Sequence, residues 1–90
     1  MKEAEVFIHE KLNILYDSIP NIKIRYEYME SLRSYFIEIL PVELFKSNID
    51  YIELEMEIEE EFENLYDEEI LFITKGSLCE INNATFTLGY

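Results

Sequence analysis

The sequence predicts a small α+β domain in which two helices cover one face of a three- or four-stranded mixed sheet. Apolar residues recur at helical spacing in residues 3–18 and again in 49–66, and they alternate with polar residues in two segments between these helices. The predicted order is helix, strand, strand, helix, strand, with a further strand near the C-terminus. A chain of 90 residues is one domain's worth and can bury only about 60–65% of its unfolded surface. Residues 1–90 are therefore expected to fold as one unit around a thin core.

The first element is an amphipathic helix over residues 3–18. Its apolar stripe consists of Ala4, Ile8, Leu12 and Leu15, and Phe7 and Ile14 widen the stripe on one side. Pro20 ends this helix, because proline disfavours the helical conformation in the residue before it. Residues 22–28 then alternate Ile and Tyr with Lys, Arg and Glu, which is the pattern of a strand with one buried face.

A second strand is predicted over residues 35–40, where apolar positions alternate again. The polar break between the two strands is short, which favours an antiparallel hairpin. This pairing would bring Lys23 or Arg25 opposite Glu38 on the outer side of the sheet. Pro41 suits the first turn of a short helix that runs through Phe45, because the N–H group that proline lacks would have no partner there.

Residues 49–66 fit two patterns. In the first, apolar residues alternate with glutamates as in a strand; these residues are Ile52, Leu54, Met56 and Ile58. In the second, an apolar stripe at helical spacing covers more of the segment; it consists of Tyr51, Leu54, Ile58, Phe62 and Leu65. Glu and Met favour helices, and Glu is depleted in strands. We therefore predict a helix with the second set in the core, capped by Ser47 or Asn48.

The apolar run at residues 70–73 predicts a strand that is covered on both faces and lies near the centre of the sheet. A right-handed crossover through the second long helix makes this strand parallel to the strand before that helix. Residues 78–81 are expected to add an edge strand. Residues 82–90 form either a mobile tail or an edge strand. The sheet face away from the helices is left to solvent or to a partner.

The negative charge of the protein is concentrated in one segment. The chain has 20 Asp and Glu residues against seven Lys and Arg, for a formal net charge of −13. Eleven of the acidic residues fall within residues 50–69, which contain no Lys or Arg. Affinity for a phosphate backbone comes from clustered Lys and Arg, so we expect no direct binding of nucleic acid. The expected partner is a basic protein, or the chain has no partner.

The acidic helix presents two sets of carboxylates. One set lies opposite the apolar stripe, as a solvated face should, and consists of Glu53, Glu57, Glu60 and Glu61. A second set, spaced by four residues, lies at the margin of the buried surface. Two interpretations stay open for this second set, which consists of Glu55, Glu59 and Glu63. Either it reaches into water or pairs with Lys23, Arg25 or Arg33 of this chain, or it contacts basic residues of another chain. The candidate partner-binding residues are Glu53, Glu55, Glu57, Glu59, Glu60 and Glu63.

The sequence contains no recognisable catalytic or cofactor motif. His9 and Cys79 are the only histidine and cysteine, which is too few for a structural zinc site. Two glycines cannot build a Gly-rich phosphate loop. His9 is expected at the surface or at its boundary, and Cys79 is expected to be a small buried hydrophobe. We therefore expect no catalytic residues, no cofactor, no metal and no enzymatic activity.

Four function classes follow from this pattern. The first is a protein-binding domain, such as an immunity or antitoxin-like inhibitor that covers a basic site on an enzyme, because complementary charge accelerates association. The second is a homodimeric scaffold or subunit-interaction domain. A nucleic-acid mimic and a small enzyme of unknown reaction are less favoured. The chain shows no secretory signal pattern and no run of roughly 18 apolar residues, so a cytoplasmic protein without a membrane partner is expected.

Overall fold

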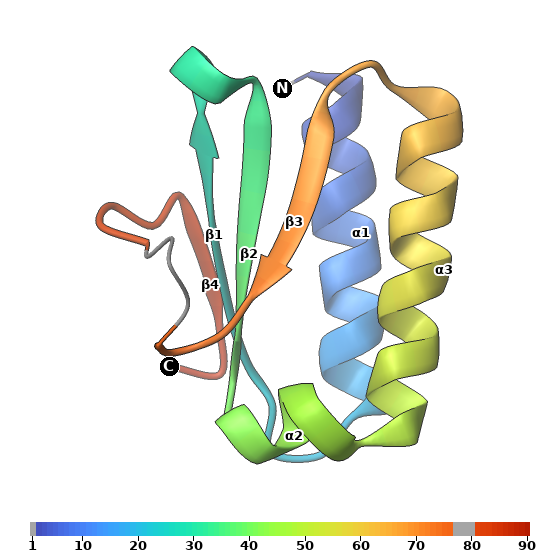
Figure 1. Cartoon of the computed structure of the whole chain (residues 1–90), viewed down its shortest axis with the longest axis vertical. Coiled ribbons are helices and arrows are strands. Elements are labelled where there is room, and N and C mark those ends of the chain that lie inside the picture. Colours follow the sequence, from blue (N-terminus) through green and yellow to red (C-terminus); the bar gives the residue numbers. More distant parts are fainter. Residues whose placement is uncertain (1, 77–80) are drawn as a thin grey trace.

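The computed structural model of the chain describes residues 2–76 and 81–90. Its helices are α1 (Glu3–Ser18), α2 (Val42–Ser47) and α3 (Ile49–Leu65), and a 3-10 turn, η1 (Glu30–Leu32), joins the first two strands. Its strands are β1 (Lys23–Met29), β2 (Ser34–Leu40), β3 (Glu69–Ile73) and β4 (Phe86–Leu88). The predicted α+β class and order of elements are confirmed (Figure 1). The predicted burial of Cys79, and most of the strand predicted at 78–81, lie outside the described residues.

The strands form one mixed sheet in the order β3-β2-β1-β4. β1 is antiparallel to both of its neighbours, and β3 is parallel to β2, as the crossover through α3 predicts. The prediction that β3 is a central strand is wrong, because β3 ends the sheet. An apolar run indicates cover on two faces, but Leu71 is 41% exposed. The C-terminal strand pairs with β1 at the opposite edge, so among residues 2–76 and 81–90 no strand pairs with the outer edge of β3.

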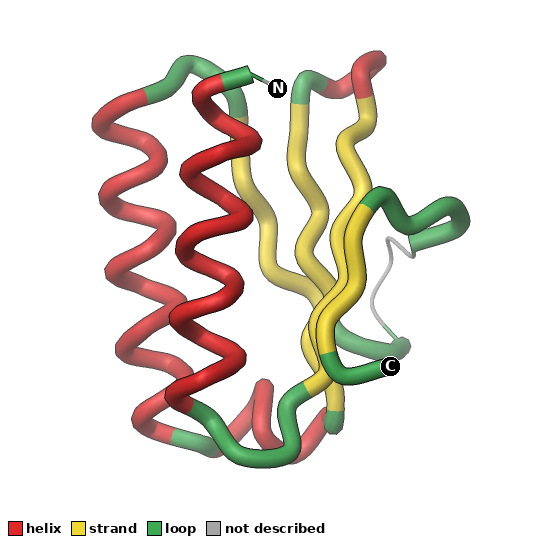
Figure 2. The backbone as a smooth tube through the Cα atoms, turned by 180° about the vertical axis from the view of Figure 1, so that it is seen from behind, coloured by secondary structure: helices red, strands yellow, loops and turns green. Residues whose placement is uncertain are grey.

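Helices α1 and α3 pack side by side on one face of the sheet (Figures 1 and 2). The four main residues of the predicted α1 stripe are buried: Ala4, Ile8, Leu12 and Leu15. Of the two residues predicted to widen it, Phe7 is half-buried, but Ile14 is 50% exposed and its predicted place in the stripe is wrong. In α3, Tyr51, Ile58 and Phe62 are buried, whereas Leu54 is only half-buried. The helical assignment of residues 49–65 is thus confirmed.

The predicted core position of Leu65 is wrong, because this side chain is 62% exposed. The position predicted for Leu65 in the core is occupied by Tyr66, which lies one residue beyond the end of α3. Its ring packs on Phe7 and Phe62, with centroid distances of 5.8 and 5.1 Å. At the other end of α3, the Asn48 side chain accepts a hydrogen bond from the Tyr51 N–H at 3.0 Å, so Asn48 is the predicted cap.

The outer side of the hairpin contains the predicted ion pair. The β1–β2 register places Arg25 opposite Glu38 and Lys23 opposite Leu40. Arg25 Nε donates to Glu38 Oε1 at 2.7 Å, and Nη2 donates to Oε2 at 3.2 Å. The pair is bidentate and Glu38 is only 5% exposed, which makes it stronger than an ordinary surface salt bridge. Arg25, not Lys23, is therefore the partner of Glu38.

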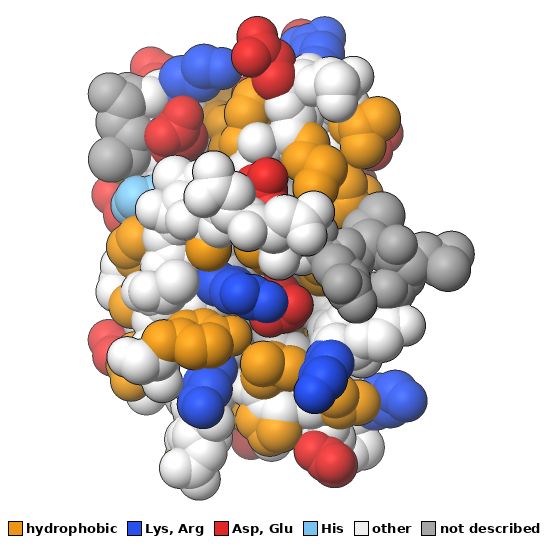
Figure 3. Space-filling model, turned by 90° about the vertical axis from the view of Figure 1, so that its left-hand side faces the viewer, with side chains coloured by type: hydrophobic (Ala, Val, Ile, Leu, Met, Phe, Trp, Pro, Cys, Tyr) orange, Lys and Arg blue, Asp and Glu red, His pale blue; other side chains and the backbone are white. Residues whose placement is uncertain are grey.

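The C-terminal segment crosses this outer face, so the expectation of an open sheet face is wrong. Ile81 is buried, and the backbone N–H groups of Asn82 and Asn83 each donate to the Glu27 carboxylate at 3.1 Å. Phe36, in the middle of the face, is 2% exposed. Figure 3 shows the same face, with Lys and Arg side chains among hydrophobic ones in its lower part. Residues 81–83 thus cover part of the face that the sequence predicts to be open.

Two truncations on α3 test how its apolar stripe is oriented. Phe62→Ala should lower the free energy of unfolding by about 3–5 kcal/mol, because it empties a fully buried site. Leu65→Ala should cost less than about 1 kcal/mol, because Leu65 is mostly exposed. Chemical denaturation of both variants measures the difference. Equal losses would contradict the rotation of α3 described above.

Candidate functional site

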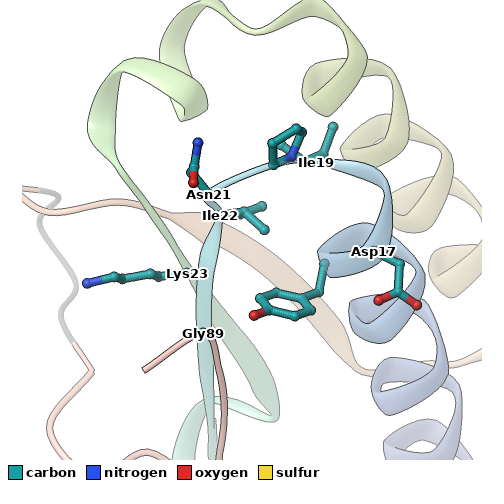
Figure 4. Close-up of a pocket in the computed structure, with 8 residues that line it drawn as sticks. Asp17, Ile19, Asn21, Ile22, Lys23 and Gly89 are labelled. Carbon is teal, nitrogen blue, oxygen red and sulfur yellow. The ribbon is translucent and has the colours of Figure 1, made fainter.

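A hollow of about 600 Å³ lies where α1 leads into β1. Tyr16, Asp17, Lys23 and Gly89 are among the residues that line it. Figure 4 shows that Asp17 and Lys23 point away from each other, so these charged groups do not converge on one point in the hollow. The hollow therefore presents no paired acid and base.

Gly89 shapes this hollow because no other residue fits its position. Its φ angle is +84°, and a Cβ atom there would lie 2.8 Å from the Ile22 carbonyl oxygen and 3.0 Å from the Tyr16 ring. Glycine tolerates both the positive φ and the close approach. The C-terminal residues can therefore follow β1 closely only with glycine at this point.

His9 has a structural role in this arrangement. Its Nε2 atom lies 2.7 Å from the Tyr26 hydroxyl, and its ring stacks on Phe86 at a centroid distance of 4.3 Å. The half-buried ring thereby links α1 to β1 and β4, in agreement with the boundary position predicted for it. Within residues 2–76 and 81–90, no three His, Asp or Glu side chains come together in a way that could hold a metal ion.

The predicted partner-binding residues all lie on α3, but their surroundings differ. Glu53, Glu57, Glu60 and Glu63 are exposed, whereas Glu55 and Glu59 are half-buried. Lys11 of α1 forms a salt bridge of 3.1 Å with Glu61 and so identifies the flank of α3 that faces α1. At 100° per residue, Glu55, Glu59 and Glu63 project from the opposite flank. We call these three residues the acidic row.

Two carboxylates of the acidic row, Glu55 and Glu59, lie in an environment that disfavours their ionised form. Burial and the neighbouring Glu59 raise the pKa of Glu55 to about 7, although the Tyr51 hydroxyl opposes this shift. Burial and the neighbouring Glu63 raise the pKa of Glu59 as well. The Tyr51 hydroxyl is itself buried and has no hydrogen bond of normal geometry. The row therefore contains charges that this chain desolvates without neutralising them.

The acidic row continues into a hollow of about 560 Å³ between the end of α3 and the start of β3. Glu59 and Glu63 line it from α3, and Ile70 and Leu71 line it from β3. Three further carboxylates line its wall: Asp67 and Glu68 come from the connection between the two elements, and Glu69 is the first residue of β3. Sequence reasoning missed these three residues, because only the fold brings the connection beside the row. In the sequence, the only indication of these three residues is that they belong to a local run of acidic residues.

Basic side chains gather elsewhere, on the lower part of the outer sheet face (Figure 3). Lys23 and Lys75 line a hollow of about 440 Å³ beside Leu40 and Pro41. A smaller hollow of about 310 Å³ lies between Arg25, Lys75 and Leu40, among others. The protein thus presents opposite charges on different surfaces. In addition, no helix among the described residues has the length and hydrophobicity of a membrane span.

The Gly89 position can be tested against the other glycine. Gly89→Ala should destabilise the protein by about 1–3 kcal/mol more than Gly76→Ala. Both residues have positive φ, +84° and +92°, but only at Gly89 would a Cβ meet other atoms within 4 Å. Thermal melts of the two variants compare a clash plus backbone strain with strain alone. Equal shifts would contradict the close approach of Gly89 to Ile22.

The surroundings of Glu55 predict a pH-dependent gain from Glu55→Gln. The folded-state pKa is raised from 4.5 to about 7, so the ionisation penalty is absent at low pH and grows as the pH rises through this range. The variant should be more stable than the wild type by about 1–2 kcal/mol at about pH 8, after allowance for solvent screening at a half-buried site, and by much less at about pH 5.

The exposed Glu57 supplies the control for this measurement. Glu57→Gln also removes one negative charge from α3, but it should give a small gain of similar size at both pH values. Denaturation of both variants at the two pH values separates desolvation from simple repulsion. The same gain for both variants would contradict the buried character of Glu55.

Comparison with protein-family models, with curated proteins and with solved structures finds no match for the chain. Inference about its function therefore rests on the charges, hollows and strand edges of the molecule itself.

Proposed function

We propose that the protein is a non-enzymatic protein-binding domain that recognises a basic partner through the carboxylates of α3. The observation that supports this proposal is the state of the acidic row. Glu55 and Glu59 are half-buried, and their pKa values are raised by burial and by the next carboxylate along the row, which is Glu59 for Glu55 and Glu63 for Glu59. The salt bridges within residues 2–76 and 81–90 are Lys11–Glu61 and Arg25–Glu38, and neither involves the row.

A basic partner would relieve a cost that the folded chain already bears. Like charges four residues apart on a helix cost about 0.2–0.5 kcal/mol per pair, and desolvation at Glu55 and Glu59 adds to this cost. A Lys or Arg side chain placed against the row would lower both pKa values. Because part of the desolvation is already complete in the free protein, such a contact should contribute more than an exposed salt bridge does.

Among basic partners, an enzyme or other protein with a positively charged functional site fits best. An inhibitor of this kind, comparable in role to an immunity protein or an antitoxin, gains speed of association from a strong charge of opposite sign. The net charge of −13 and its concentration on and around α3 supply that property. The exposed residues Glu53, Glu57 and Glu60 would contribute to steering and the acidic row would contribute to the contact.

A homodimer would have less surface available for its interface. The C-terminal segment covers much of the outer sheet face, and the β4 edge is only three residues long. The longer free edge, on β3, lies beside the acidic row and the acidic hollow. Two copies that met there would bring like charges together, which opposes association.

Two charge-reversal variants test the proposed function. One replaces Glu55, Glu59 and Glu63 by Lys, and the other replaces Glu53, Glu57 and Glu60 by Lys. Each carries a formal net charge of −7 instead of −13, because every Glu→Lys change adds two charges. Affinity capture from the source cell identifies the wild-type partner. Binding of that purified partner to the three proteins is then measured by surface plasmon resonance at low and high salt.

The expected partner is basic, and the row variant should bind it at least about 100-fold more weakly than the wild type. The outward variant should associate about tenfold more slowly at low salt and dissociate normally. Equal affinity of all three proteins would contradict the proposal. A solution mass of twice the chain without a captured partner would favour the homodimeric alternative. Circular dichroism melts confirm that each variant is folded.

A further inference from the structure

We propose that the segment of the partner that contacts the acidic row is an extended basic peptide, which adds as a fifth strand to the free edge of β3. This inference rests on the proposed function and specifies the form that the partner takes at the site. It combines two features that arise from different parts of the chain: the unpaired edge of β3 and the carboxylates of α3 beside it.

The outer edge of β3 pairs with no strand among residues 2–76 and 81–90. The Glu69 N–H donates to the Arg33 carbonyl at 3.1 Å. Since backbone polar groups of successive strand residues point to opposite sides, Glu69, Leu71 and Ile73 bond to β2. The N–H and C=O groups of Ile70 and Phe72 then point away from β2, toward the free edge. In Figure 1 β3 and α3 are the elements nearest the viewer, with β1 and α1 behind them.

The acidic row runs beside this edge. The Lys11–Glu61 contact places α1 on one flank of α3, and Glu59 and Glu63 on the other flank line the same hollow as Ile70. α3 contacts β3 more extensively than it contacts any other strand. A strand added about 4.8 Å beyond β3 would therefore direct alternate side chains toward the row. Lys or Arg at those positions would meet the half-buried carboxylates.

The opposite face of the added strand would meet a different surface. Leu71 points to the outer side of the sheet and is 41% exposed, so an apolar residue of the peptide can pack beside it. The peptide that fits this edge thus alternates basic and apolar residues. Edge pairing supplies affinity through the main chain, and alternate side chains supply the specificity.

A buried polar group also points to an occupant at this place. The Tyr51 hydroxyl is fully buried and lacks a hydrogen bond of normal geometry. It lies against the row: burial raises its pKa most, and the charges of Glu55 and Glu59 raise the pKa further. A cation that pairs with Glu55 would hold this carboxylate in its ionised form, which is the stronger acceptor for the hydroxyl. The free protein therefore leaves the Tyr51 hydroxyl without a well-formed hydrogen bond beside the acidic row.

The same arrangement excludes a second copy of this chain. Pairing of two β3 edges would place two acidic rows beside each other, and repulsion at close range would oppose it. Charged residues at an open edge are a known way to prevent self-association of strands. They do not prevent pairing with a strand of opposite charge, so the row selects the partner as well as protecting the edge.

The experiment uses a peptide of about seven residues that alternates Lys and Val, with blocked ends. Two further peptides carry N-methyl groups, one on the Lys amides and the other on the Val amides. All three have the same charge, but the methylated set of amides cannot donate to β3. Binding is followed on the full-length protein by NMR, with amide hydrogen exchange at Ile70 and Phe72 and with the Leu71 amide, which faces β2, as the internal control.

We expect the unmodified peptide to slow exchange at Ile70 and Phe72 by at least about tenfold, with little change at Leu71. One of the two methylated peptides should lose binding and the other should keep it, because only one set of amides faces β3 in a given strand direction. A peptide with Glu in place of Lys should not bind. The variant with Lys at positions 55, 59 and 63 should not bind the Lys peptide, whereas the variant with Lys at positions 53, 57 and 60 should.

Equal binding of both methylated peptides, or binding without protection at Ile70 and Phe72, would overturn strand addition and leave the charge-based proposal intact. Absence of binding by the unmodified peptide would also overturn the inference. The proposed function is judged separately, by the capture of the partner and its sensitivity to the row variant. Strand addition at β3 and the proposed binding of a basic partner can therefore be contradicted independently.

Discussion

The rest of the structure depends on the burial of one apolar stripe of α3, formed by Tyr51, Ile58 and Phe62. Local preferences alone do not secure this helix, because its glutamates repel one another at a spacing of four residues. Each large side chain of the stripe contributes about 1.5–3 kcal/mol on burial, which offsets the repulsion. The stripe also sets the rotation of α3, so that Glu61 faces Lys11 and the acidic row faces the edge of β3. Core packing, not charge, thus decides where the charges lie.

The free edge of β3 has a separate origin in the path of the C-terminal segment. This segment crosses the outer sheet face, where Asn82 and Asn83 bind Glu27, and then pairs β4 with β1. Had it paired with β3 instead, the row would stand beside a filled edge. The position of the row follows from the core and the open edge follows from the tail, so neither feature requires the other. Because the acidic row and the edge of β3 lie along the same side of the molecule, we regard them as a single surface.

The elements that sequence predicts well are those with a local cause. The stripe of α1 follows from helical periodicity, and the Arg25–Glu38 pair follows from the alternation and short connection of the hairpin, which together set its register. The edge position of β3 could not be predicted, because an apolar run does not specify how many strands flank it. Helical periodicity also assigned Leu65 to the core. The Tyr66 ring packs there instead, because α3 ends at Leu65 and the chain changes direction. The glutamates of α3 were predictable as a group, but the flank that faces β3 depends on contacts between distant segments.

A simpler explanation of the acidity is that it only keeps the protein soluble and its strands apart. Solubility alone favours carboxylates at full exposure, and Glu53, Glu57 and Glu60 meet that condition. Glu55 and Glu59 do not, because they are half-buried with raised pKa values and so lower the stability of the free domain at neutral pH. Protection of the β3 edge explains why charges stand there, but protection would need no desolvation. A contact with a cation that arrives beside β3 accounts for both the position of these carboxylates and their cost.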